Sequence, residues 1–566
     1  METKDLTIHE SSDPDESRKE VNQLDGGIDP RNEIKGLKLL LLHIALSLCT
    51  FLVGLVGFLR AALVFHSQSK TDDVKDFNML ATAVPAITSE FNSLGDVGWY
   101  GGSFYIALCT TTPLAGKAFT LFPKKTVFLS SLALFEVGSL LCALAPSSAS
   151  LIGGRAISGV GASGIFAGGL IILTTVIPLQ RRAVWTGTLN STFAVAAIVG
   201  PLISGALTQH ATWRWCFWIN LPIGGFSAVV VIIFFHVKGA ITEQASLGPK
   251  IRSLDLVGFI FFSGSVSCLL LALQLGGSTN YPWNSATIIG LFIGAVAIFC
   301  VFVPWQLYMK ELALLPPRLL VGSRNIPLIW ASAFFANGAF QCVIYWLPIW
   351  FQAVLGASPE LSGVKYLPTV ISDVLTSVIG AGLVNTLGFW NLFLIFGTMM
   401  ISIGGGLLST LNPSISEGHW IGYQILGGIG YSLIVTMAHL GSQASLAAEL
   451  VPLGATSLLF VISASCAIFL AIGEAIFETQ LRKNLDGLVS ASLMERIIST
   501  GATQVRSVIP DEYLSIVIAA YSKAVTQVFY ITAAAPVISF LFIVWTKWTS
   551  HVKDDSKDKQ EANESA

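Results

Sequence analysis

The sequence predicts an all-α polytopic membrane protein with about fourteen membrane-spanning helices. Of its 566 residues, 53% are hydrophobic and only 12% are charged, and the mean hydropathy is +0.70. Soluble domains carry about 25% charged residues, so an ordinary soluble enzyme is excluded. Apolar runs of roughly 20 residues, the length that a helix needs to cross the hydrocarbon core, recur along the chain. Their centres lie near residues 47, 107, 136, 164, 195, 226, 265, 297, 340, 374, 399, 430, 464 and 535.

Basic residues predict the orientation of these spans. An even number of spans places both polar tails, residues 1–36 and 547–566, on one side of the membrane. Lys and Arg are enriched in cytoplasmic loops, and here they fall in alternate short connections, with Arg214 as the main exception. Both termini are therefore expected in the cytoplasm. A long connection at residues 480–523 is expected outside, with helical apolar spacing at residues 488–498 and 513–525.

The fifth span contains the pair Gly200–Pro201, and an aromatic and cationic cluster follows at residues 213–218. Proline inside a helix removes a backbone hydrogen bond and kinks the helix. In lipid this is tolerated where neighbouring helices or a cavity satisfy the freed groups, so the pair predicts a bent interior helix. The cluster Trp213-Arg214-Trp215 is expected in the headgroup layer, where amphipathic rings are enriched.

Several of these segments resemble one family. Residues 200–205 (GPLISG) and 213–224 (WRWCFWINLPIG) are similar to the fifth-span motif and the following connection of the fungal 14-span drug:proton antiporters, a branch of the major facilitator superfamily that includes toxin-efflux pumps. Residues 76–85 (DFNMLATAVP) resemble its first-span motif, and residues 151–161 (LIGGRAISGVG) its fourth-span motif. In the second half, residues 345–354 and 473–477 resemble the ends of spans nine and thirteen. The resemblance covers nearly everything from residue 76 to residue 477.

The resemblance implies a major facilitator fold, with two six-helix bundles and the substrate held between them near the membrane midplane. Gly200, Pro201 and Gly205 would form a conformational interface between the bundles. The expected organisation is a disordered tail (1–36), an N-terminal bundle of spans 1–6 (37–236), a linker with spans 7 and 8 (237–309), a C-terminal bundle of spans 9–14 (310–546) and a second tail (547–566).

The loop between spans two and three carries a further family feature. The superfamily has basic residues and an acid in this cytoplasmic loop. The present loop retains the basic residues but has no acid, which weakens the expectation of a charge latch. The residues that match the loop motif are Gly116, Lys117, Lys124 and Lys125.

Four ionisable residues within the predicted spans are candidates for proton coupling, because a charge at mid-bilayer costs roughly 3 kcal/mol. Arg155 is the expected charge partner of an acid or anion, and the alternative is that it pins helices together through backbone carbonyls. Asp76 is the expected titrating acid, unless it lies solvated at a span end. Glu136, in the third span, and Asp373, in the tenth, are alternatives that could equally be acids of helix packing.

Polar and aromatic residues on the first and ninth spans are candidates for lining a substrate cavity, with helix packing as the alternative. They are Asn78, Asn337, Gln341, Tyr345 and Trp346. The sequence has no phosphate-binding glycine-rich loop and no nucleophile elbow, so neither ATP hydrolysis nor another enzymatic activity is expected. The eight cysteines and eight histidines have no metal-ligand spacing, and a net charge of −2 gives no reason to expect nucleic acid. No cofactor and no metal are therefore expected.

Residues 56–75 interrupt the first span with several charges. Skipping them gives the continuous segment FLVGL-DFNMLATAVP, which matches the family motif. We hypothesise that these residues are a translated intron; the alternative is a real loop that breaks the span.

The resulting expectation is a proton-coupled exporter of a small apolar secondary metabolite, toxin or drug. It would act as a monomer in the lipid bilayer of the plasma membrane, or alternatively of the vacuole. An importer of the same fold, for a siderophore or a basic amino acid, is one alternative. A receptor or scaffold that has lost transport is another.

Overall fold

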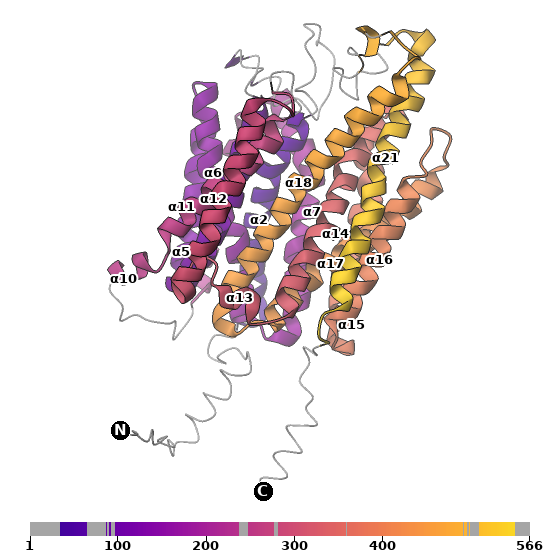
Figure 1. Cartoon of the computed structure of the whole chain (residues 1–566). Coiled ribbons are helices and arrows are strands. Elements are labelled where there is room, and N and C mark those ends of the chain that lie inside the picture. The colour runs from indigo at the N-terminus through magenta and orange to yellow at the C-terminus, as the bar shows by residue number, and fades with distance from the viewer. Residues whose placement is uncertain are drawn as a thin grey trace, which may run out of the picture.

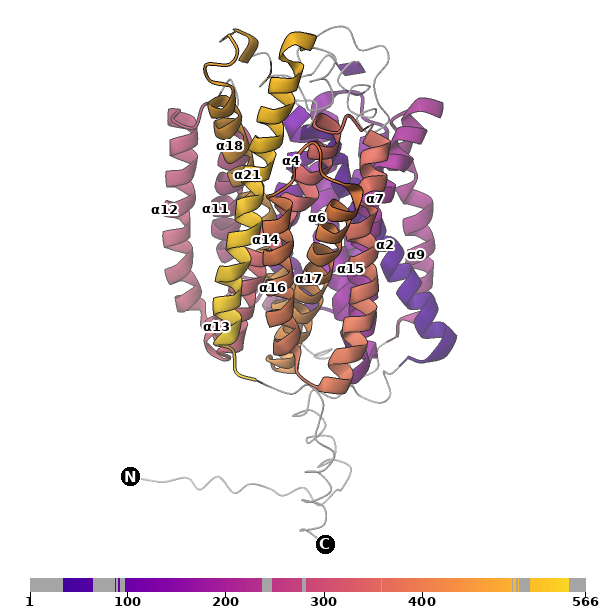
Figure 2. The same ribbon diagram turned by 90° about the vertical axis from the view of Figure 1, so that its right-hand side faces the viewer.

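The computed structural model describes residues 34–64, 87, 90–91, 97–236, 247–276, 281–357, 359–490, 492–494, 497 and 509–548. In this part the chain forms long helices that run alongside one another (Figures 1 and 2). Twelve of the described helices are long and apolar enough to cross a membrane. Two more, α4 (Val97–Leu121) and α7 (Leu179–His210), are 25 and 32 residues long and lie within the same bundle. The predicted all-α membrane fold is therefore confirmed.

The helices fall into a first half, a linker and a second half. The first half has α2 (Gly36–Val64), α4, α5 (Lys124–Ala143), α6 (Ser148–Val176), α7, α8 (Trp215–Trp218) and α9 (Asn220–Phe234). The linker has α10 (Leu247–Arg252), α11 (Leu256–Leu275), α12 (Ala286–Met309) and η3 (Lys310–Leu312), and α13 (Pro317–Val321) follows it at the start of the second half. The second half has α14 (Asn325–Ala353), α15 (Pro359–Leu387), α16 (Trp390–Leu408), α17 (Glu417–Ala444), η4 (Ala448–Leu450), α18 (Val451–Leu485) and α21 (Asp511–Val544).

Both ends of the described chain lie at the same end of the bundle. Figure 2 shows α2 beginning and α21 ending at its lower end. We call this the tail end, and the opposite end the far end. Because successive helices alternate in direction, α4, α12 and α17 finish at the tail end, and α7 and α18 begin there.

Each half has a hydrophobic core of its own. One cluster of buried residues fills the first half and reaches the linker helices, and a larger one fills the second half. The halves meet mainly where α4 packs on α18 and α7 packs on α15. Leu459 of α18 belongs to the first cluster, whereas Val184 of α7 packs against the second. The two halves therefore have separate main cores and are joined chiefly along two helix pairs.

Two segments differ from the sequence prediction. Helix α18 extends to Leu485 and α21 begins at Asp511, so the predicted loop at residues 480–523 is much shorter, and residues 513–525 are part of α21. Their apolar spacing comes from a helix that is longer than the bilayer is thick. Helix α2 continues through residues 56–64, which extends the first span into the suspected insertion. Residues 65–75 lie outside the described part of the chain.

Helix α7 runs from Leu179 to His210 and passes through Gly200 and Pro201 without a break. Gly200 is buried against the first helix, and a β-carbon there would lie 3.7 Å from Cδ1 of Leu55. The side chains at positions 201 and 205 are outside the described ones, so the conformational interface at Gly200, Pro201 and Gly205 stays a prediction.

Candidate functional site

Arg155 is fully buried on α6, about 10 Å along the helix from its far end at 1.5 Å per residue. Its Nε donates a hydrogen bond of 2.6 Å to the backbone oxygen of Tyr100 on α4, and its guanidinium lies 4.6 Å from the ring centre of Phe104. Its two terminal nitrogens have no hydrogen-bond partner among the described residues. Asp76, the acid expected to pair with it, is not among them.

Glu136 lies between α5 and α9. Its carboxylate fills the space beside Gly224, where a β-carbon would overlap Oε1. Both carboxylate oxygens are buried without a hydrogen-bond partner in the described structure. One turn away on the same pair of helices, Asn220 donates to Oγ of Ser139 over 3.1 Å. Glu136 therefore lies inside the first half, on helices that do not form the main contact with the second half.

Asp373 lies on α15, close to the contact between the halves. Its side chain is buried, and its backbone oxygen accepts a hydrogen bond of 2.8 Å from Ser432 of α17. One turn further along α15, Ser377 shares a hydrogen bond of 2.7 Å with Ser191 of α7. Asp373 is thus about one helical turn from a direct bond between the halves.

The polar residues of the predicted ninth span join α14 to α18. Asn337 donates to the backbone oxygen of Ile462 over 3.2 Å and contacts Sγ of Cys466 at 3.2 Å. The thiol of Cys466 in turn donates to Oε1 of Gln341 over 3.6 Å. Asn337 is buried, whereas Gln341 and Cys466 are half-buried. The structure brings Asn337 and Gln341 together through one cysteine that the sequence did not single out.

The aromatic residues of the same span divide into two groups. Trp346 is 2% exposed and packs 4.5 Å from the ring of Phe477, which makes it a core residue in this conformation. Tyr345 is half-buried and meets Trp346 edge to face at 5.1 Å. Tyr431 of α17, also half-buried, stacks on Phe340 at 4.4 Å. Asn78, the remaining cavity candidate, lies outside the described residues.

The four residues of the predicted loop motif lie at the tail end. Thr456 of α18 occupies the space where a β-carbon of Gly116 would lie, so the two halves are in close contact there. Lys117 donates to two backbone oxygens of the segment that follows α12. Lys124 and Lys125 bond within the first half, to Thr175 Oγ1 at 2.8 Å and to the backbone oxygen of residue 232 at 2.6 Å.

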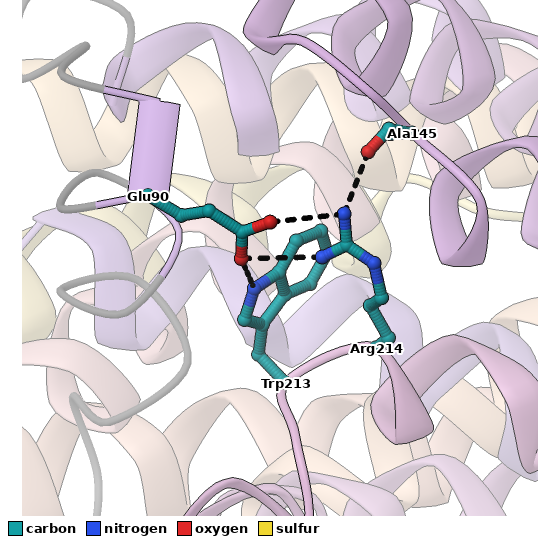
Figure 3. A network of polar contacts seen from close by, with 4 residues as sticks. All are labelled: Glu90, Ala145, Trp213 and Arg214. Carbon is teal, nitrogen blue, oxygen red and sulfur yellow. Dashed lines mark hydrogen bonds and ion pairs between the residues drawn. The ribbon is translucent and has the colours of Figure 1, made fainter.

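A polar network joins three connections at the far end (Figure 3). Arg214 forms an ion pair of 3.0 Å with Glu90 and donates to the backbone oxygen of Ala145 over 2.8 Å. The indole N–H of Trp213 donates to the same carboxylate over 2.7 Å. This carboxylate neutralises Arg214, the main exception to the predicted alternation of basic residues.

The structure corrects the prediction for one of the two tryptophans in this cluster. Trp213 is 4% exposed and packs edge to face on Phe217, so its ring is buried in the protein at the far end and does not face lipid headgroups. Its indole N–H donates to the carboxylate of Glu90 and needs no headgroup as a partner. Trp215 is 51% exposed, as expected of an interfacial ring.

A sequence profile decides the family. The profile described as Major Facilitator Superfamily matches residues 75–473, well over half of the chain. The chain belongs to the major facilitator superfamily. Three curated proteins that align with most of this chain are named efflux pumps. It is 42% identical to efflux pump roqT of Penicillium rubens, over 84% of this chain and 88% of that one.

Two further curated relatives have similar identity. Efflux pump aunC of Aspergillus niger is 38% identical over 97% of this chain and 94% of its own. The rubrofusarin-specific efflux pump aurT of Gibberella zeae is 39% identical over 84% of this chain and 86% of its own.

Solved structures support the fold. The human organic anion transporter MFSD10 superposes with a TM-score of 0.54 at 12% identity, covering 90% of this chain and all of that one. A double-tryptophan mutant of XylE superposes with a TM-score of 0.52 at 12% identity, covering 90% of this chain and 96% of that one. At this identity the likeness shows the major facilitator fold alone.

The partners of several residues at these sites were not found by sequence reasoning. Glu90, Gly224 and Tyr431 have partners more than 80 residues away or on other helices, and no local spacing shows such pairs. Asp255 could have been found, because an acid just before an apolar run is typical of a helix N-cap. Its carboxylate does cap α11 by accepting from the backbone N–H of Gly258 over 2.9 Å.

Proposed function

We propose that this facilitator exports a small, largely apolar secondary metabolite, toxin or drug by alternating access, driven by inward proton flow. Its relatives named as efflux pumps align over most of its length. The observation that carries the mechanism is that each half has its own main buried cluster, and that the halves meet closely at the tail end, where the side chain of Thr456 fills the space beside Gly116. Separating the halves there would open a path from the tail end without unfolding either core.

The proposed location is the plasma membrane, with the vacuolar membrane as the alternative, and with the tail end in the cytoplasm. Lys117, Lys124 and Lys125 are among the basic residues at the tail end, and a cytoplasmic excess of Lys and Arg is the general rule. With this orientation the described conformation is closed toward the cytoplasm. The proposed partners are the lipid bilayer, the substrate and protons, and the proposed working unit is a monomer.

The proposed coupling unit is Arg155 with Asp76. Two unpaired terminal nitrogens on a buried guanidinium support a partner that is an acid or an anion. Between the two alternative acids, the position of Asp373 near the Ser191–Ser377 bond favours it, because protonation there acts directly on the contact between the halves. Glu136, inside the first half, is the less favoured candidate.

The proposed cavity lining consists of Gln341, Tyr345 and Tyr431, which are half-buried and belong to helices near the centre of the second half. Asn337 and Trp346 are proposed to support them from behind, because both are buried in this conformation. A mixed aromatic and amide lining suits a flat, largely apolar ligand with a few hydrogen-bonding groups.

Proton flow supplies enough free energy for this export. A potential near 100 mV gives about 2.3 kcal/mol per charge, and one pH unit adds about 1.4 kcal/mol. One proton could therefore sustain roughly a 500-fold gradient of a neutral substrate.

The test uses the purified full chain in sealed vesicles with an imposed pH gradient. Rubrofusarin, which one relative's name specifies, is the first compound to try. Apolar metabolites whose biosynthetic enzymes are encoded beside the gene would follow. Export predicts substrate movement opposite to proton movement. Movement in the same direction would favour the importer, and proton flux that never depends on any substrate would contradict the proposal.

A further inference from the structure

The chain passes from the first half to the second at the tail end, just after α12. Leu314 belongs to the buried cluster of the first half, and Leu319 belongs to that of the second. Only four residues separate them, and two of these are Pro316 and Pro317. Whatever holds residues 311–315 therefore fixes the point from which the second half starts.

Asp255 holds this segment from the linker. Its carboxylate is buried at 3% exposure and accepts four hydrogen bonds. Oδ2 accepts from the backbone N–H of Leu314 at 2.7 Å and from Gln306 at 3.1 Å. Oδ1 accepts from Trp305 at 2.8 Å and from the backbone N–H of Gly258 at 2.9 Å. A buried carboxylate with this many donors is strongly fixed in place.

Gln306 and Lys117 bind the same segment from two other helices. The amide oxygen of Gln306 accepts from the backbone N–H of Leu315 over 2.9 Å. Lys117, at the tail end of α4, is 6% exposed and donates to the backbone oxygens of Ala313 at 2.7 Å and Glu311 at 3.2 Å. Three side chains from three helices thus bind four backbone groups within five residues.

The backbone is strained at the same place. In the part of the chain that the structure describes, the non-glycine residues with positive φ are Asp255, at 51°, and Lys310, at 50°. Such conformations cost on the order of 1–3 kcal/mol each and persist where the surroundings over-determine them. Lys310 directly precedes the bonded segment, and Asp255 accepts a hydrogen bond from it, so the segment is held in place against a local conformational cost.

We infer that Lys117, Asp255 and Gln306 form a clamp that fixes residues 311–315 to the first half and so positions the contact between Gly116 and Thr456. The second half then begins to move at Pro316, six residues later than the boundary expected from the sequence. The clamp residues are positioning residues: they act on the gate through the segment. Asp255 also interacts electrostatically with Lys117. The loop between the second and third spans contains no acid, and this acid of the linker takes that place.

This inference rests on the proposed alternating access, and its test reads accessibility instead of transport. Thr456→Cys places a thiol at the closed contact, where Thr456 is 0% exposed. Labelling with a membrane-impermeant maleimide is followed in inside-out vesicles, which present the proposed cytoplasmic side. Lys117→Ala and Asp255→Asn are expected to speed labelling roughly tenfold, equivalent to about 1.4 kcal/mol. Lys117→Arg, which keeps the charge and the donors, should label at the parent rate.

Lys125→Ala is the matched control, because Lys125 also donates to a backbone oxygen but within the first half. Each variant is also labelled without the new cysteine, so that buried native thiols such as Cys342 report general loosening. Equal labelling of parent, Lys117→Ala and Asp255→Asn would overturn the clamp, as would an equal rise at the native thiols. If the parent transports nothing while the labelling contrast holds, the proposed function fails and the clamp stands.

Discussion

Ser191 of α7 and Ser377 of α15 share a hydrogen bond of 2.7 Å that joins the two halves of the molecule. One turn before Ser191, Gly187 lies so close that a β-carbon there would be 3.0 Å from the backbone oxygen of Ser377. This hydrogen bond, and the lack of a side chain on Gly187, let α7 and α15 approach closely. This contact has to form and separate if the halves alternate.

A valine at position 187 is therefore expected to prevent closure of this contact. Gly187→Val should reduce transport at least tenfold, because its branched side chain would press on the backbone of α15, which cannot yield as a flexible side chain can. The measurement is substrate flux in vesicles. Gly153→Ala is the control, because nothing lies within 4 Å of a β-carbon at position 153. Normal flux with Val at 187 would show that this contact does not limit the cycle.

Position 224 is expected to require glycine, because the carboxyl group of Glu136 occupies the space that a side chain there would need. Gly224→Ala should lower the free energy of unfolding by about 1–3 kcal/mol, because the added methyl overlaps that group. Gly225→Ala, the next residue, has open space and should be neutral or slightly stabilising. Thermal unfolding of the purified protein measures both.

The same pair gives a coupling test. If the overlap causes the loss, Glu136→Ala should relieve most of it, so the double variant will be less destabilised than the sum of the two single ones. Simple additivity would mean that the cost of Gly224→Ala arises elsewhere.

The two tryptophans at the far end should differ in their effect on stability. Trp213→Ala is expected to cost about 3–5 kcal/mol, because it removes a buried ring and leaves Glu90 with fewer donors. Trp215→Ala, at a ring that is 51% exposed, should change stability much less. Thermal unfolding in lipid nanodiscs compares them, and equal losses would argue against Trp213 as the residue that fastens this end.

Arg155 should be required for coupling. Arg155→Ala is expected to abolish substrate-dependent proton movement, and Arg155→Lys should not restore it, since a lysine lacks the planar set of donors. Arg181→Ala, at an exposed position of α7, is the control and should keep normal coupling. Proton flux that survives in Arg155→Ala would leave the buried guanidinium with only a packing role.

Residues 56–75 give a prediction about the messenger RNA. The family profile begins to match at residue 75, at the end of the suspected insertion. A spliced transcript that joins the codons of Leu55 and Asp76 is expected to dominate, and a chain without residues 56–75 should transport at least as well as the full one. Sequencing the transcripts decides the first point, and retained codons in the main transcript would rule out the intron.

The sequence predicted the helices well because a membrane demands them. A lipid-exposed backbone has no other partner than itself, so each run of about 20 apolar residues had to become a helix. The clamp could not be predicted in the same way. Lys117, Asp255 and Gln306 are far apart in the sequence. They share as partner a backbone segment that carries no motif. Trp213 was misplaced because its partner, Glu90, lies on a distant connection.

Helices α18 and α21 are 35 and 34 residues long, which at 1.5 Å per residue is about 50 Å. A bilayer core is only about 30 Å thick, so these helices extend well past it at the far end. Their parts beyond the bilayer core project from the second half. A small rigid protein inserted between them would move with that half, and electron microscopy could then follow the rocking of single molecules without any label in the substrate path.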